Sequence, residues 1–166
     1  MVVEVGSFAD RVEAYVHGQL ERKRSEAQQR FDEIKGNFAR DRKILHNYNV
    51  KGQFEQAASI LSESLGYICD VGEEGEPELD LSNPQKPEIK GEGKRYSLSL
   101  RWYDPQKVKS WDICVIVGDE RIEVLSFLNH VVELPVDVTA ELLNDAIFDA
   151  FTRPREITND WVAARK

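Results

Sequence analysis

Three residues in the second half of the chain have the side-chain types of a small nucleophilic site. Cys114 could supply a thiolate, Glu123 a carboxylate and His130 an imidazole base, and nucleophilic catalysis needs such a base within hydrogen-bonding reach of the nucleophile. The alternating apolar pattern on either side of Gly118-Asp119 predicts a β-hairpin that turns there and sets Cys114 directly across from Glu123. No sequence feature brings His130 to these two residues. A small hydrolase or transferase around Cys114, Glu123 and His130 is therefore an alternative interpretation and not the main one.

Patterns typical of metal and nucleotide sites are missing from the sequence. The two cysteines and three histidines stand far apart, without a Cys-x-x-Cys or His-Glu-x-x-His spacing. The acidic stretch 73–80 lacks the alternating ligands of a calcium loop, and residues 91–94 have too few glycines for a phosphate-binding loop. We therefore assign no catalytic residue, no cofactor and no metal, and expect a noncatalytic protein.

A local excess of positive charge marks the segment from Glu21 to Lys43. The chain of 166 residues has a formal net charge of -8, whereas this segment has eight basic and five acidic residues and a net charge of +3. A basic helix could lie along a phosphate backbone, so a nucleic-acid-associated factor is a second alternative. The residues that would carry it are Arg22, Lys23, Arg24, Arg30, Arg40, Arg42 and Lys43. Because charges of both signs are mixed here and the chain is acidic overall, we do not expect nucleic acid to be the partner.

A long helix is expected to position these basic residues. Residues 7–45 contain no proline and place apolar side chains three and four apart, with Ser7 as a suitable N-cap. A second helix is expected over residues 51–65, with Gly66 suited to its left-handed C-terminal cap. Residues 1–66 would thus form a helical arm or a helical hairpin.

The remainder of the chain predicts an antiparallel sheet followed by a helix. The strands are expected at residues 67–71, 96–102, 111–117, 122–124 and 130–134. A final helix should run from Asp137, as its N-cap, to about Thr152, and the stretch 72–93, with three prolines, reads as a long acidic loop. We therefore expect one α+β domain over residues 1–166. It would comprise a helical region (1–66), four to five antiparallel strands with a helix packed on one sheet face (67–152) and a tail (153–166).

The long first helix also bears on assembly and function. One continuous helix over residues 7–45 would extend about 58 Å at about 1.5 Å per residue, too far to be covered by its own domain. We therefore expect a homodimer or higher oligomer in which Phe31, Ile34 and Phe38 are the protein-interaction residues. The main interpretation is a noncatalytic protein-interaction module, such as an adaptor, chaperone-like factor or inhibitor, that binds a protein partner through its helical arm and sheet.

The apolar content of the chain bears on its location. The longest aliphatic run, Ile113 to Val117, is far shorter than the roughly 20 residues of a membrane-spanning helix. The residues after Met1 lack the apolar stretch of a secretory signal. We therefore expect a cytoplasmic protein without a membrane partner.

Overall fold

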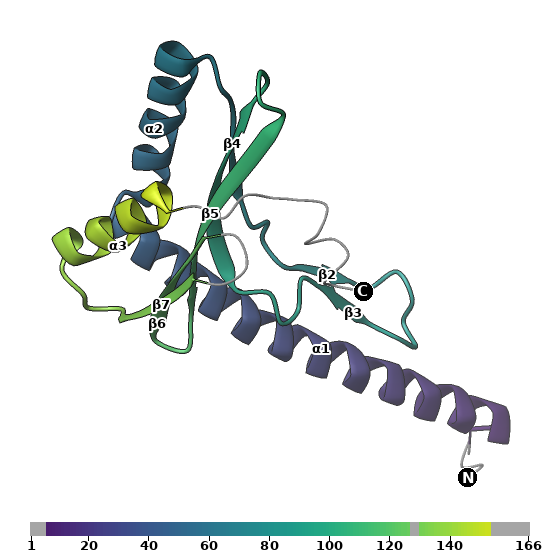
Figure 1. Ribbon diagram of the computed structural model, residues 1–166. Helices are drawn as coiled ribbons and strands as arrows, with labels where there is room; N and C mark the ends of the chain where they lie inside the picture. Colours follow the sequence, from purple (N-terminus) through teal and green to yellow (C-terminus); the bar gives the residue numbers. More distant parts are fainter. Residues whose placement is uncertain (1–5, 127–129, 154–166) are drawn as a thin grey trace, which may run out of the picture. The chain divides into compact units, whose positions relative to one another are not determined.

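The computed structural model describes residues 6–126 and 130–153 and confirms the predicted α+β class (Figure 1). Its helices are α1 (Phe8–Asn47), α2 (Val50–Leu65) and α3 (Ala140–Thr152). Its strands are β1 (Ile68–Glu73), β2 (Glu78–Asp80), β3 (Glu88–Lys90), β4 (Tyr96–Asp104), β5 (Lys109–Gly118), β6 (Arg121–Ser126) and β7 (His130–Pro135). The chain divides into two compact units, Met1–Phe38 with Glu76–Lys94 and Ala39–Gly75 with Arg95–Lys166.

Helix α1 is uninterrupted over 40 residues, so the two glycines within it do not end it (Figure 1). Its N-terminus is capped by Ser7, as the sequence predicts. The Asp10 amide donates to the Ser7 hydroxyl at 3.1 Å, and the Ser7 amide donates to the Asp10 carboxylate at 3.1 Å. This reciprocal capping satisfies two amides that have no partner inside the helix.

The smaller unit contains a short hairpin within the segment that the sequence suggested was a loop. Strands β2 and β3 pair antiparallel, with Leu79 opposite Ile89. Each strand has three residues, too few to show an alternating pattern. Two contacts tie the hairpin to α1, since Lys23 Nζ donates to the Gln85 carbonyl at 3.1 Å and Arg30 forms an ion pair with Glu92.

The larger unit is built on a five-stranded antiparallel sheet in the order β1-β4-β5-β6-β7. Inward-facing residues of β4, β5 and β6 alternate with half-exposed ones and form the core, together with Leu45, Phe54 and Leu143. Helix α2 contacts β1 and β4, whereas α3 contacts β5, β6 and β7. Gly66 ends α2 with a φ of 69°, the left-handed conformation expected of it.

The predicted register of the β5–β6 hairpin is wrong by two residues. The turn residues are Asp119 and Glu120, with φ of 52° and 60°, and not Gly118 and Asp119. Val115 therefore lies opposite Val124 and not opposite Ile122. Because side chains alternate with a period of two, this shift leaves the same residues facing the core.

The last helix begins two residues later than expected. Its N-cap is Thr139, whose hydroxyl accepts from the Leu142 amide at 3.3 Å, and Asp137 precedes it in the turn after β7. The helix ends at Thr152, as expected. The rest of the predicted tail, residues 154–166, lies outside the described residues. None of the helices described is long and apolar enough to cross a membrane.

Candidate interaction surfaces

The strand register changes the pairing expected for the predicted nucleophilic site. Cys114 lies opposite Leu125, and Glu123 lies opposite Ile116, so the expected Cys114–Glu123 juxtaposition is wrong. In the sheet, Cys114 pairs with Leu125, and Leu125 pairs in turn with Val131. The backbone of His130 pairs with that of Ser126. By backbone pairing, Cys114 and His130 thus belong to adjacent rows of the ladder on different strands.

The electrostatics of this sheet face also disfavour a reactive thiolate. Burial, and secondarily the nearby Asp112 carboxylate, raises the pKa of Cys114 to about 11. A thiol with such a pKa is protonated at neutral pH and is a weak nucleophile. Glu123 instead accepts two hydrogen bonds from Arg95, at 3.2 and 2.7 Å, which lower its pKa. Arg95 and Glu123 therefore form an ion pair that links β6 to the start of β4.

The carboxylates of the β2–β3 hairpin do not assemble a metal site. Asp80 lies 4.0 Å from the Lys90 ammonium group, and Glu88 lies 3.8 Å from that of Lys86. Across the described ranges, no three histidine, cysteine or acidic residues are grouped closely enough to hold a metal ion. Asp80 and Glu88 thus each have a lysine as an ion-pair partner.

Several of the basic residues on α1 are engaged by groups of the protein itself. Besides the contacts of Lys23 and Arg30 with the hairpin, Arg40 lies 3.7 Å from the carboxylate of Asp41, and Arg42 lies 3.6 Å from that of Glu73. Arg22 and Lys43 are exposed. Of the predicted nucleic-acid residues, Arg30, Arg40 and Arg42 thus have an acidic partner within the chain.

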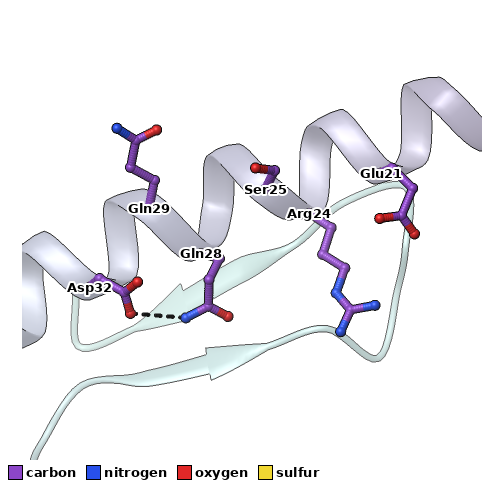
Figure 2. Close-up of a pocket in the computed structure, with 6 residues that line it drawn as sticks. All are labelled: Glu21, Arg24, Ser25, Gln28, Gln29 and Asp32. Carbon is purple, nitrogen blue, oxygen red and sulfur yellow. Dashed lines mark hydrogen bonds between the residues drawn. The ribbon is translucent and has the colours of Figure 1, made fainter.

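A polar depression runs along α1 but shows no convergent chemistry. It has a volume of about 460 Å³ and is lined by Glu21, Arg24, Ser25, Gln28, Gln29 and Asp32, all on one helix (Figure 2). Gln28 donates to Asp32 at 3.0 Å, while Arg24 and Gln29 point to different sides of the helix. Since these groups are not directed at one point, they do not make a binding site.

The predicted interaction residues on α1 differ in accessibility. Phe38 is buried, with 7% of its surface exposed, whereas Phe31 and Ile34 are half-buried. Lys35 lies above the Phe31 ring, 5.9 Å from its centroid, and thus shields part of it. Of the three, Phe31 and Ile34 retain surface that a partner could contact.

More strongly exposed apolar residues lie nearer the start of the same helix. Phe8 and Tyr15 are 84% and 68% exposed, and Val12 and Val16 are exposed as well. Because residues three and four apart share a helix face, these four side chains form one stripe, which we call the α1 stripe. The sequence shows their spacing, but it did not show that this end of the helix stays uncovered while the hairpin contacts later turns.

A second apolar surface lies on the larger unit, between α2 and α3. This groove, which we call the α2–α3 groove, has a volume of about 410 Å³. Leu100 of β4 and Ile113 of β5 form its floor. Its walls come from α2 (Gln53, Phe54, Ala57, Ile60 and Leu61) and from α3 (Asn144, Ile147, Phe148 and Phe151).

Sequence reasoning missed Ile60 and Phe148 of this groove. Both are large and apolar, yet 62% and 65% exposed. One signal was available, because Leu142 and Phe148 widen the apolar surface of α3 beyond the single stripe that a sheet can cover. An apolar surface of this width indicates a helix with a second contact.

Similarity to known proteins does not assign either surface. Comparisons with protein-family models, with curated proteins and with solved structures found no match.

Proposed function

We propose that this chain is a noncatalytic protein-interaction module that pairs with a second copy of itself through the α1 stripe. The observation that carries the proposal is the stripe of Phe8, Val12, Tyr15 and Val16, which is apolar and exposed on a capped helix. Contiguous exposed apolar residues mark interaction sites, whereas single exposed apolar residues are normal on protein surfaces.

The spacing of the stripe suits pairing between helices. The steps of four and three residues from Phe8 to Val12 and Tyr15 repeat the spacing of coiled-coil core positions. Burying a large apolar side chain contributes roughly 1.5–3 kcal/mol, so two copies of the stripe would bury enough surface for a weak to moderate dimer. A two-fold axis brings the same patch of both copies together, and two-fold dimers are the commonest oligomers.

The same helix offers a continuation of this contact. Phe31 and Ile34 are half-buried and could extend the interface toward the end of α1, whereas buried Phe38 would contribute mainly to packing within the chain. The proposal therefore retains the homodimer expected from the sequence and places its main contact earlier on the helix.

Light scattering after size exclusion tests the pairing. Wild-type protein should have the mass of a dimer at tens of micromolar, and Tyr15→Asp should weaken the dimer at least tenfold because a carboxylate would be buried in the interface. Ala14→Asp is the matched control. It adds the same charge at a neighbouring exposed position, about 100° around the helix from Tyr15, and it should leave the dimer intact.

Two outcomes would contradict the pairing. One is a monomeric wild type throughout the micromolar range, and the other is equal masses for Tyr15→Asp and Ala14→Asp. Circular dichroism of both variants checks that the helix content is the same, so that a change in mass cannot be ascribed to an unfolded α1.

A further inference from the structure

The α2–α3 groove has a solvent-shielded floor and open walls. Leu100 and Ile113 on its floor are each 1% exposed, whereas Ile60 and Phe148 stand on opposite walls and remain largely exposed. An occupant could therefore reach the sheet between the helices and cover both wall residues. Covering exposed apolar side chains is the main favourable term in most associations.

The two walls have an acidic surround. On α3, Glu141 and Asp145 are exposed, whereas Asp149 forms an ion pair with Arg153 at 3.3 Å. On α2, Glu63 is exposed three residues after Ile60, and the helix has a single lysine. That lysine, Lys51, donates to the Glu73 carboxylate at 2.9 Å. An apolar groove edged by carboxylates favours a partner with basic residues at the border of its apolar face.

We propose that the α2–α3 groove binds an amphipathic helix of a partner protein, with apolar side chains at i, i+4 and i+7 and lysine or arginine on both edges. The apolar residues would fill the groove between Ile60 and Phe148, and the basic residues would meet the carboxylates of α3. This is the helix-in-groove mode of recognition, in which two or three anchors on one helix face supply most of the contact.

The dimensions and charge of the groove favour this occupant over others. A volume of about 410 Å³ cannot hold a whole helix, which is about 10–12 Å across with its side chains, so only side chains from one face of a helix would enter it. The exposed walls leave the rest of a helix room to lie on the surface. An acidic or uncharged apolar segment would gain nothing from Glu141 and Asp145.

A designed peptide tests this with the full-length protein. The probe is a fluorescent 18-residue helix with leucine at i, i+4 and i+7 and lysine on both edges. One comparison peptide has glutamate in place of lysine, and another has serine in place of leucine. Anisotropy titrations should show binding of the lysine peptide, at least tenfold weaker binding of both others, and weaker binding of the lysine peptide at 500 mM than at 50 mM salt.

Two pairs of variants locate the binding. Phe148→Asp should lower the affinity for the lysine peptide at least tenfold. Leu142→Asp should leave this affinity unchanged, because Leu142 is 56% exposed on the same helix but lies outside the groove. Asp145→Lys should lower the affinity for the lysine peptide several-fold and raise the affinity for the glutamate peptide. Tyr15→Asp should bind like wild type, which separates this inference from the pairing proposed for α1.

Several results would overturn the inference. They are equal binding by Phe148→Asp and Leu142→Asp, equal affinity for the lysine and glutamate peptides, or no saturable binding. A Trp161→Ser protein that binds the peptide tenfold more tightly than wild type would show that the chain's own residues 154–166 occupy the groove instead. Loss of the dimer in Phe148→Asp would show that a second copy occupies it.

Discussion

At the scale of single residues, Glu73 connects four elements of the larger unit. Its carboxylate accepts from the Tyr96 hydroxyl at 2.7 Å and from Lys51 at 2.9 Å, and it lies 3.6 Å from Arg42. These groups come from β4, α2 and α1, while Glu73 itself ends β1. The hydrogen bond from Tyr96, followed by that from Lys51, lowers the pKa of Glu73. Burial, followed by the hydrogen bond to Glu73, raises the pKa of Tyr96.

The lowered pKa gives a pH dependence with a definite sign. A carboxyl group whose pKa is lower when folded stabilises the protein above its unfolded pKa of about 4.3, and this contribution is lost as the pH falls through the folded pKa. Glu73→Gln should therefore reduce the free energy of unfolding by about 1 kcal/mol at pH 7 and by much less at pH 3. Urea titrations at both pH values measure this difference.

Glu63→Gln provides the control for Glu73. It removes the same charge from an exposed position on α2, where surface carboxylates contribute little, and it should change stability only slightly at either pH. An effect of Glu73→Gln that is the same at pH 7 and pH 3 would show that the carboxylate charge is not what matters there.

Gly118 shows how a correct residue type can predict the wrong role. Its place between two apolar runs suggested a turn glycine, yet it is the last residue of β5 and pairs with Arg121. A Cβ at this position would collide with the Arg95 side chain, which crosses it on the way to Glu123. Glycine is needed there for a close approach, and no local pattern distinguishes this need from a turn.

At the scale of elements, the β5–β6 turn is built from unfavourable residues. Asp119 and Glu120 both have positive φ, as the first-choice hairpin turns require. Aspartate tolerates this conformation, whereas glutamate is strained in it. Glu120→Gly should therefore raise the free energy of unfolding by about 0.5–1 kcal/mol, despite the greater freedom of glycine in the unfolded chain. Chemical denaturation measures the change.

Glu120→Ala separates turn strain from side-chain effects. Alanine also has a Cβ, so the strain should persist and stability should stay near that of wild type. If alanine stabilises the protein as much as glycine does, removal of the glutamate charge, and not relief of the backbone, explains the gain.

The elements that the sequence predicted well are those with long patterns. The helical period of α1 continues through Gly18 and Gly36, and the alternation of β4 from Tyr96 to Trp102 covers seven residues. Strands β2 and β3, of three residues each, are defined by pairing and show no such pattern. The α2–α3 groove could not be predicted, because it depends on the spacing of two helices that are 74 residues apart in the sequence, counted from Leu65 at the end of α2 to Thr139, the N-cap of α3.

At the scale of the whole molecule, the two units have different kinds of stability. The larger one has a continuous core of fully buried residues, including Leu45, Leu98, Val115 and Leu143. In the smaller one, the hydrogen bonds and ion pairs that join the hairpin to α1 involve exposed side chains such as Lys23 and Arg30. Regions with few buried apolar contacts open at lower free energy than the core does, so we expect the smaller unit to open first.

Replacing the hairpin tests this difference in stability. The Glu74 amide donates to the Ser97 carbonyl at 3.0 Å, so the chain ends that flank residues 76–94 are close together and a short Gly/Ser linker can join them. The entropic free-energy cost of closing a loop changes by only about 0.6 kcal/mol when the length of the loop is halved. The sheet should therefore unfold in one cooperative transition, with a free energy within about 1 kcal/mol of the wild-type value.

Hydrogen exchange locates the effect of this replacement. Amides of α1 between Leu20 and Arg30 should exchange faster, because the contacts of Lys23 and Arg30 with the hairpin are gone, while amides of β4, β5 and β6 should keep their protection. Faster exchange across those strands, or a broad multistep transition, would show that the hairpin supports the core of the larger unit. Unchanged exchange throughout α1 would instead show that the hairpin does not stabilise these turns of the helix.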